Sequence, residues 1–337
     1  MKIKKPYIIA EIGVNHNGSV DLAKKIISKC QKLGASAVKF QTYITENIVA
    51  TDTLLADYQK NSIHQKTQFE MLKKYELSFS NFISLFNHAK KLKIDFISTA
   101  HDIESLSFLA KELKIKTIKI SSADLTNIQL LIHAGRTKKN LIISSGLSSI
   151  NEIDIALSAI CYGAFYKDFN FRVNKHKFIY KKYSSYLEKK VKLLHCTSEY
   201  PAPLNELNLN IIDTLSERYS MDIGYSDHSN DTNTAVILST KNVSIIEVHV
   251  TPDNNLNGPD HKASLSYQSF AKYVKNIEKT HIMLGKYIKN VTCSERRNIK
   301  VVRKKLFFGR VKSRILTDLQ KKNSSIFLKT RKIKKMA

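Results

Sequence analysis

The stretch Ile246-Glu247-Val248-His249-Val250-Thr251-Pro252-Asp253 decides how this chain is interpreted. Its first part alternates apolar and polar residues, which predicts a strand with one apolar face. Glu247 and His249 share the other face. A carboxylate and an imidazole buried side by side cost free energy unless a metal, a proton or a substrate uses them. With the charged run from Asp260 to Lys262 just beyond, the stretch predicts a functional site at the end of a strand.

Seven further short runs rich in β-branched residues recur along the chain, most of them separated by amphipathic segments. The eight expected strands are residues 7–12, 37–41, 95–99, 117–121, 141–145, 192–196, 222–225 and 244–250. The clearest expected helices are residues 20–33, 79–92, 103–113 and 150–160. Alternating strands and helices indicate right-handed crossovers and a parallel sheet. Eight such units predict a closed (β/α)8 TIM barrel of the α/β class. An open doubly wound sheet is the alternative, but no GxGxxG follows the first strand.

Three segments depart from this pattern. Residues 43–78 form a long polar connection that we expect to fold over the barrel mouth. Its polar residues include Tyr58, Gln59, His64 and Gln68. Residues 166–190 are expected to form a surface insertion with little chemistry. After Lys286 the chain is basic and has too few apolar residues for a core of its own. We therefore expect a barrel domain over residues 1–285 and a linker with a small second domain over residues 286–337.

Composition narrows the class of protein. The 337 residues are 42% hydrophobic and carry a formal charge of +26. A nucleic-acid or membrane-surface partner and a lysine-rich surface both account for this charge. No RNP-like aromatic pattern, zinc-finger spacing or helix-turn-helix pattern accompanies it, so no nucleic-acid partner is expected. No apolar run reaches the roughly 20 residues of a membrane span, so no membrane partner is expected either. Four scattered cysteines and the lack of a signal-peptide pattern favour a reduced, cytoplasmic protein.

Polar residues gather at the expected carboxyl ends of the strands, where barrels place their active sites. Lys39 and Lys119 lie on two different strands, and buried lysines require a counter-charge. An anion between them is therefore expected. Serine hydroxyls at neighbouring strand ends would supply neutral donors to it, and a phosphate fits this set.

His228 and His249 end neighbouring strands in this arrangement. Two imidazoles with open positions suit a divalent metal that acts as a Lewis acid, although two core histidines remain the alternative. A metal that polarises a carbonyl beside a phosphate-bearing partner indicates carbon–carbon bond formation. Glu11 or Glu247 could then handle a proton or orient a water molecule.

Several long motifs resemble the sialic acid synthase family, which includes N-acetylneuraminate, legionaminate and pseudaminate synthases. The similar stretches are Ile9 to Gly18, Val38 to Thr42, Leu194 to Pro201, Gly224 to His228 and Gly258 to Leu265. The resemblance runs in order from about Pro6 to Arg303. It implies a TIM barrel followed by a small antifreeze-like (SAF) domain, in a domain-swapped homodimer.

The resemblance also implies an activity. Such enzymes condense phosphoenolpyruvate with an N-acetylmannosamine-type aldose and release phosphate by C–O cleavage. The product is a nine-carbon 2-keto acid such as sialic, legionaminic or pseudaminic acid. The divalent metal is expected to be Mn²⁺, with Mg²⁺ or Co²⁺ as alternatives. A catalytically weak homologue with a binding or assembly role, or another enolpyruvate-condensing barrel such as a 3-deoxy-heptulosonate-type synthase, are the competing interpretations.

By this resemblance, His228 and His249 are expected to hold the metal, Glu11 to lie beside C2 of phosphoenolpyruvate, and Glu247 to support the metal site. The positions expected around phosphoenolpyruvate are Lys39, Lys119, Ser122, Ser144, Ser198 and Ser226. The positions expected around the metal or the sugar are Gln41, Asp124, Tyr200 and Asp260.

Several positions depart from the family pattern. Val248 replaces a lysine, Asp124 replaces a common glutamate, and Ser198 stands where asparagine is frequent. The chain also stops at Ala337, before the Arg-Pro-Gly-x-Gly stretch of the antifreeze-like domain, and Lys329-Thr330-Arg331 is a poor substitute. We therefore expect this domain to be short and incomplete.

Overall fold

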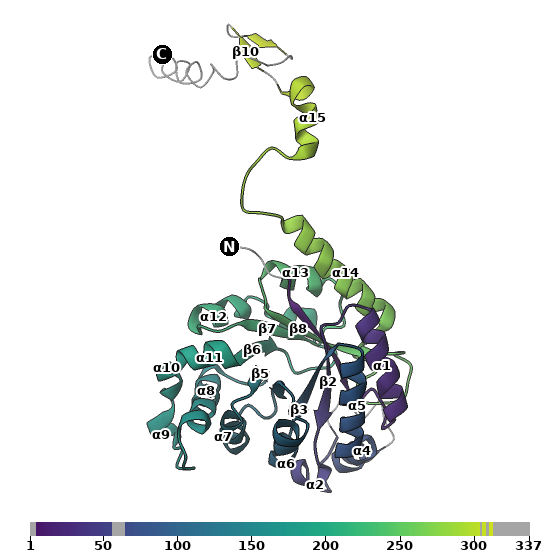
Figure 1. The fold of residues 1–337 in the computed structure, drawn as a ribbon, viewed down its shortest axis with the longest axis vertical. Helices are drawn as coiled ribbons and strands as arrows, with labels where there is room; N and C mark the ends of the chain where they lie inside the picture. The colour runs from purple at the N-terminus through teal and green to yellow at the C-terminus, as the bar shows by residue number, and fades with distance from the viewer. Residues whose placement is uncertain (1–4, 56–64, 304, 308–309, 313–337) are drawn as a thin grey trace. The chain divides into compact units, whose positions relative to one another are not determined.

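The computed structural model describes residues 5–55, 65–303, 305–307 and 310–312. Eight parallel strands pair in chain order, and β1 also pairs with β8, so the sheet closes into a barrel (Figure 1). The strands are β1 Tyr7–Gly13, β2 Ala37–Thr42, β3 Asp95–Ala100, β4 Thr117–Ile120, β5 Asn140–Ser144, β6 Val191–Cys196, β7 Ile223–Asp227 and β8 Ile245–Thr251, with the short β9 Leu265–Ser266 beside β8. The predicted (β/α)8 barrel is confirmed, and five of its strands end one or two residues later than predicted.

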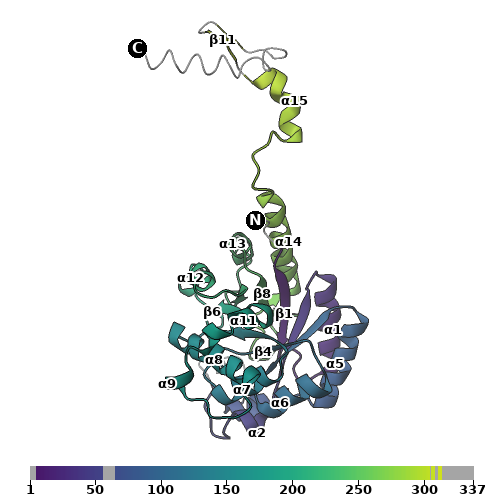
Figure 2. The ribbon, with the colours of Figure 1, turned by 60° about the vertical axis from the view of Figure 1, so that its left-hand side comes forward.

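Helices surround the barrel on its outside (Figures 1 and 2). In the first half these are α1 Val20–Lys32, α2 Thr45–Ile48, α4 Gln68–Tyr75, α5 Phe79–Lys91, α6 Ile103–Ser107, the π-helical turn η1 Phe108–Glu112 and α7 Ile128–Arg136. In the second half they are α8 Ile150–Phe165, α9 Val173–His176, α10 Ile179–Lys182, α11 Ser184–Lys190, the 3-10 turn η2 Leu204–Glu206, α12 Ile211–Arg218, α13 Thr234–Thr240 and α14 Tyr267–Leu284. The helix expected over residues 103–113 is therefore split into α6 and η1.

Side-chain caps explain where several of these helices begin. Ser19, Ser78 and Ser149 each accept a hydrogen bond from a backbone N–H of the first turn of α1, α5 and α8. Ser149 and Glu152 form a complete capping box at the start of α8. Such caps satisfy N–H groups that have no partner within the helix. The serines that follow strands in this sequence thus start helices as well as line the barrel mouth.

The core has two parts, and strand alternation decides which residues enter each. One face of every strand packs against the helices, and Phe40 and Val248 lie in this outer core, as predicted. The other face points into the barrel. Its lower part is an apolar plug formed by Ile9, Ala37, Ile97, Ile142, Leu194 and Ile245. This plug closes the barrel beneath the carboxyl ends of the strands.

The long connection after β2 packs against the loop that follows β1. Val14 of that loop shares a small buried cluster with Leu55, Met71 and Tyr75. Within the connection, an isolated antiparallel bridge joins Leu54 to Thr67. Of the residues expected over the barrel mouth, Tyr58, Gln59 and His64 lie outside the described residues.

The chain divides into two compact units, Ile3–Gly285 and Lys286–Ala337, the latter joined by Met1–Lys2. The described part of the second unit contains the helix α15 Cys293–Val302 and an antiparallel pair, β10 Lys305–Phe307 and β11 Arg310–Lys312. Thr292 and Glu295 form a capping box at the start of α15. Lys329-Thr330-Arg331 lies outside the described residues, so the antifreeze-like domain stays a prediction.

Two glycines let α7 and α8 approach each other closely. A Cβ atom built on Gly135 would lie 2.0 Å from the carbonyl oxygen of Ile160 in α8. A Cβ atom built on Gly163 would lie 1.9 Å from the carbonyl oxygen of Ile132 in α7. Real carbon and oxygen atoms cannot approach this closely, so each glycine is required by the packing of the other helix.

We predict that Gly163→Ala lowers the free energy of unfolding by about 2 kcal/mol or more, because α7 and α8 must separate to admit the methyl group. Urea unfolding followed by circular dichroism measures this. Gln129→Ala, an exposed change on α7, should stay within about 0.5 kcal/mol of the parent protein. Equal stability of Gly163→Ala and the parent would show that the helices are not in this close contact.

Candidate active site

A polar layer lies directly above the apolar plug, because the inward-facing positions change from apolar to polar along each strand. In the strand register, Glu11 of β1 lies beside Lys39 of β2 on one side and beside His249 of β8 on the other. Thr99 of β3 lies beside Lys119 of β4 in the same way. Barrel closure therefore gathers side chains that are more than 200 residues apart into one layer.

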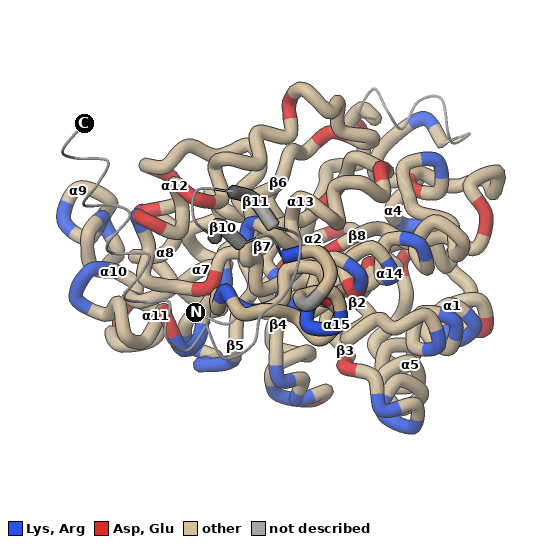
Figure 3. Tube along the Cα trace, turned by 90° about the horizontal axis from the view of Figure 1, so that it is seen from above, with Lys and Arg blue, Asp and Glu red and all other residues tan. Residues whose placement is uncertain are grey.

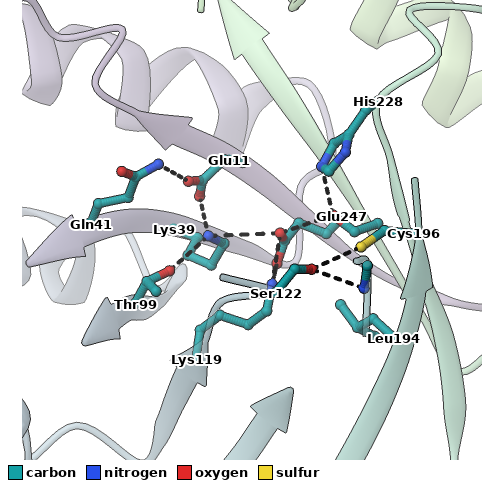
Figure 4. A network of polar contacts seen from close by, with 12 residues as sticks. Glu11, Lys39, Gln41, Thr99, Lys119, Ser122, Leu194, Cys196, His228 and Glu247 are labelled. Carbon is teal, nitrogen blue, oxygen red and sulfur yellow. Dashed lines mark hydrogen bonds and ion pairs between the residues drawn. The ribbon is translucent and has the colours of Figure 1, made fainter. Parts of the chain in front are cut away.

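Two lysines and two glutamates form a buried network at the centre of this layer (Figure 4). Lys39 Nζ lies 2.8 Å from Glu11 Oε2 and 3.7 Å from Glu247 Oε1. It also donates a 3.0 Å hydrogen bond to Thr99 Oγ1. Lys119 Nζ donates to both oxygens of Glu247, at 2.9 and 3.0 Å. The anion expected between the two lysines is therefore, in this structure, the carboxylate of Glu247.

Within the network, the opposite charges favour the ionised forms of Glu247 and Lys39. Burial raises the pKa of Glu247, but Lys119 and Lys39 outweigh it and lower that pKa to about 2. Burial lowers the pKa of Lys39, and the carboxylates of Glu11 and Glu247 outweigh it and raise that pKa above its usual value. An isolated buried charge would become neutral instead. Burial lowers the pKa of Lys119, although the carboxylate of Glu247 opposes this shift. The network therefore stabilises Lys39 as a cation at the base of the barrel mouth and places the Lys119 amine beside Glu247.

The expected serines form a second cluster, organised around Gly146 after β5. Gly146 donates a backbone hydrogen bond to Ser122 Oγ at 3.0 Å, and a Cβ atom on Gly146 would lie 2.3 Å from Ser198 Oγ. Ser122 Oγ lies 3.1 Å from Cys196 Sγ. Ser144 is 3% exposed, and its hydroxyl has no hydrogen-bond partner. A buried hydroxyl without a partner is costly, which points to a ligand that the protein itself does not supply.

The two candidate metal-binding histidines lie next to each other. Their ring centroids are 5.5 Å apart, and the ring of Tyr200 lies 4.4 Å from His228 and 5.6 Å from His249. Burial, together with the other cations, lowers the pKa of both histidines to about 4. Both imidazoles are therefore neutral near pH 7, as metal ligation requires.

The hydrogen bonds around His228 leave a lone pair for a metal. Its Nδ1 donates to the carbonyl oxygen of Thr197 at 2.7 Å, so Nε2 carries the lone pair. Ser226 Oγ lies 3.1 Å from this Nε2 and 3.1 Å from Glu247 Oε1, and its single proton can serve Glu247. The buried Nδ1 of His249 has no hydrogen-bond partner. These observations fit a metal.

No group of three or more potential protein ligands occurs among the residues that the structure describes. A set of two imidazoles therefore fits a catalytic metal with open positions better than a closed structural site. His228 and His249 are the residues that would hold it.

Asp260 and Gln41 lie next to the charged network, beside His249 and Glu11. Asp260 Oδ2 lies 3.8 Å from His249 Nδ1, and Gln41 Nε2 donates a 3.3 Å hydrogen bond to Glu11 Oε1. Burial, and then the charge of Glu11, raise the pKa of Asp260 to about 7. Gly13 has a φ of +51° and a Cβ there would lie 3.2 Å from both Gln41 Nε2 and Glu11 Oε1, so this position requires glycine.

A second network fixes the loop that carries Asp260. His261 is fully buried and lies 2.7 Å from Thr251 Oγ1 through Nδ1 and 3.1 Å from Asn17 Oδ1 through Nε2. Asn17 belongs to the loop after β1, where His16 Nδ1 accepts a 3.0 Å hydrogen bond from the backbone of Gly18. The loops after β1 and β8 are thus bonded to each other beside the site.

The structure brings most predicted site residues together, with one departure. Among the interactions of the described residues, none joins Asp124 to the other candidates, because Ser121 Oγ donates to it at 2.6 Å and His101 Nδ1 lies 2.9 Å away. Thr99 and Cys196 also contact site residues, although they were not among the residues expected there. Strand alternation could have identified both residues, because they lie on β3 and β6 two positions beyond the inward-facing plug residues Ile97 and Leu194.

Comparison with known proteins agrees with this architecture. The NeuB family model matches residues 26–289. The chain is 38% identical over 305 residues to the N,N'-diacetyllegionaminic acid synthase of Campylobacter jejuni, covering 90% of this chain and 85% of that protein. It is 36% identical to the corresponding synthase of Legionella pneumophila, covering 83% of this chain and 73% of that protein.

A solved structure extends the similarity to three dimensions. The N-acetylneuraminic acid synthetase of Leptospira borgpetersenii, in complex with citrate, superposes with a TM-score of 0.71 at 31% identity and covers 88% of this chain and 90% of that chain. The fold and these similarities define an enzyme of the synthase type. The chain belongs to the NeuB family, as its resemblance to the sialic acid synthases predicted.

We predict that the buried, uncharged state of His16 makes folding sensitive to acid. Burial, and then the charge of His261, lower the pKa of His16 to about 4, whereas an unfolded histidine titrates near 6.5. The unfolded state binds the extra proton, so each pH unit lost between 6.5 and 4 removes about 1.4 kcal/mol of unfolding free energy through this residue. His16→Asn keeps a hydrogen-bond acceptor and removes the titration.

Urea unfolding at several pH values measures the effect. Between pH 6.5 and 4 the slope of unfolding free energy against pH should be smaller by about one proton in His16→Asn than in the parent. Gln129→Ala, an exposed change on α7 that involves no titrating group, should leave the slope unchanged. Identical slopes in the parent and in His16→Asn would contradict the assignment of a neutral His16.

Proposed function

We propose that this enzyme condenses phosphoenolpyruvate with an N-acetylated amino sugar to give a nine-carbon 2-keto acid and phosphate. The observation that carries the proposal is that two of the buried atoms without a hydrogen-bond partner, Ser144 Oγ and His249 Nδ1, belong to candidate site residues. Both belong to side chains at the carboxyl ends of barrel strands, in the same polar layer as Lys39 and Lys119. They therefore mark where an anion and an electrophile would bind.

In this proposal the two lysines and the serine cluster hold the phosphoenolpyruvate anion. Phosphate oxygens take their strongest contacts from buried cations and hydroxyl donors. Glu247 supplies the negative charge beside both lysines, and Glu11 contacts Lys39 as well. Glu11 is placed to orient a water molecule toward C2 of the enol carboxylate, since burial raises its pKa toward the range of a useful base.

The acceptor sugar enters from the side of His228 and His249. A divalent metal, Mn²⁺ by preference, would there polarise the aldehyde oxygen of the open-chain sugar. Asp260 and Gln41 are placed to bind hydroxyl groups, and Tyr200 covers the two imidazole rings. Carbon C3 of phosphoenolpyruvate then attacks the aldehyde carbon, and addition of water at C2 releases phosphate by C–O cleavage.

The names of two similar relatives suggest which acceptor sugar to test first. The relatives at 38% and 36% identity are both named as synthases of N,N'-diacetyllegionaminic acid. A 6-deoxy diacetamido hexose is therefore the first acceptor to test, with N-acetylmannosamine second. We further propose a cytoplasmic homodimer, as the family resemblance implies.

A catalytically weak homologue with a binding role is the competing proposal. The intact network of Glu11, Lys39, Lys119 and Glu247 speaks against it, because a chain without catalysis has no reason to keep four charges buried. A truncated 3-deoxy-D-arabino-heptulosonate 7-phosphate synthase from Thermotoga maritima shares the fold, with a TM-score of 0.57 at 16% identity. At that identity the likeness concerns the fold alone.

An acceptor panel tests the proposed reaction. With phosphoenolpyruvate and Mn²⁺, we expect phosphate release to depend on the sugar and to be fastest with a 6-deoxy diacetamido hexose. Malachite-green detection of phosphate and mass spectrometry of the 2-keto acid give two independent readouts. Erythrose 4-phosphate serves as the control acceptor of the other barrel synthases. Faster turnover with that control, or no product with any amino sugar, would overturn the proposal.

The metal assignment gives a separate prediction. His249→Ala should lower Mn²⁺-dependent phosphate release by about 100-fold or more, since one of two protein ligands is lost. Circular dichroism checks that the fold is retained, and isothermal titration measures Mn²⁺ binding directly. His133→Ala, outside the barrel mouth, is the matched control and should behave like the parent. Near-normal turnover of His249→Ala would rule out this metal site.

A further inference from the structure

The segment between α8 and β6 presents an unusual surface on the flank of the barrel. Residues 166–190 contain seven lysines and one arginine but only one aspartate and one glutamate. They also contain seven phenylalanine and tyrosine residues. Lys and Arg mark α9, α10 and α11 at one edge of the molecule in Figure 3. This concentration of charge exceeds that of the chain as a whole, so a lysine-rich composition does not account for it.

Several residues of this segment pack against the helices of the barrel. Tyr180 and Leu187 are buried in the outer core, and the ring of Tyr162 in α8 stacks on Tyr166 at 4.6 Å. Arg136 of α7 donates hydrogen bonds to the backbone carbonyls of Lys167 and Asp168 at 2.8 and 2.7 Å. These contacts anchor the backbone of the segment to the barrel, and its remaining side chains are at least partly exposed to solvent.

Three phenylalanines in this part of the chain are exposed to solvent. Phe165 is 46% exposed, Phe169 55% and Phe178 54%, and Val173, in the same part of the chain, is 40% exposed. We name these four residues and the cations of residues 166–190 the Phe–Lys surface. Exposed rings of this size cost free energy in water, and clustered ones usually mark an interaction site.

The cations of the Phe–Lys surface form no ion pair among the described residues. Several of them lie over the rings instead: Lys177 and Lys181 are 5.1 and 4.9 Å from the centroid of Phe178. A partner that carries many negative charges and admits apolar edges therefore complements this surface.

We propose that the Phe–Lys surface docks the enzyme reversibly on an anionic membrane. Phenylalanine edges enter the headgroup region, and the lysine stems reach back to the lipid phosphates. No described helix is long and apolar enough to cross a membrane, and docking of this kind needs none. From the sequence no membrane partner was expected, because the charge alone did not distinguish a membrane surface from a lysine-rich composition and the exposed rings could not be identified.

The ring contacts favour a membrane over a nucleic acid. Single-stranded nucleic acids bind by stacking bases on free aromatic faces. Here Phe165 is already stacked on Tyr183 at 3.9 Å, and the guanidinium of Arg136 covers Phe169 at 3.5 Å. A bilayer requires only exposed apolar edges and surrounding cations. Since the segment leads into the amino-terminal end of β6, docking would also leave the carboxyl-end site open to its substrates.

Vesicle flotation with the full chain tests this proposal. The protein should float with vesicles of phosphatidylcholine and phosphatidylglycerol mixed two to one, and not with phosphatidylcholine alone. Phe169→Ser combined with Phe178→Ser should lower the partition coefficient by about tenfold, because the apolar anchors are lost. Lys181→Gln combined with Lys182→Gln should lower it by about tenfold as well.

Matched controls separate this surface from the general charge of the chain. Ile83→Ser removes an exposed apolar residue of α5, and Lys25→Gln combined with Lys29→Gln removes two exposed lysines of α1. Each control should change partitioning by less than about twofold. Thermal unfolding of every variant confirms that the fold is intact.

Three outcomes would overturn the proposal. The parent protein fails to bind the anionic vesicles, or the α1 lysine control loses as much binding as the Phe–Lys variants. In the third, the phenylalanine variant keeps vesicle binding but loses affinity for a fluorescent single-stranded oligonucleotide, which would assign the surface to nucleic acid. Because flotation needs no substrate, these results are independent of the proposed reaction.

Discussion

The mutual neutralisation of two buried lysines and two buried glutamates is the constraint on which this structure depends. Lys39 and Lys119 are each almost fully enclosed, and Glu11 and Glu247 approach them to 2.8 and 2.9 Å. Removing one member of such a set leaves an unpaired buried charge and costs several kcal/mol. The four residues come from β1, β2, β4 and β8, so the charges are balanced only when the barrel has closed.

The rest of the site follows from where this network lies. The apolar plug beneath it excludes water from one side, so the charges keep their strength toward the open mouth. Ser226 connects the network to His228, because its hydroxyl lies 3.1 Å from both Glu247 and the imidazole. Ser226 thereby lies between the anion-binding half and the metal-binding half of the proposed site. A change in either half is expected to reach the other through Glu247.

The proposed active site and the proposed membrane-docking surface lie in different parts of the barrel domain. The loops at the carboxyl ends of the strands hold the reacting groups, as in other barrels. The Phe–Lys surface lies in a connection that leads to an amino-terminal end, held by α7 and α8 and ringed by cations. It can change without disturbing the charged network, since no described contact links the two. Membrane attachment, where it occurs, would bring the synthase near its site of use without altering the reaction.

The sequence by itself determined the eight strands, their inward faces and most of the candidate site. Alternation placed Lys39, Glu247 and His249 inward, and a two-residue period is a local property that a sequence displays. Only the tertiary structure decided that Glu247 is the counter-charge of Lys119, that Asp124 is held by Ser121 and His101, and which phenylalanines face water. These depend on distances between strands far apart in the chain, which barrel closure sets and local pattern does not encode.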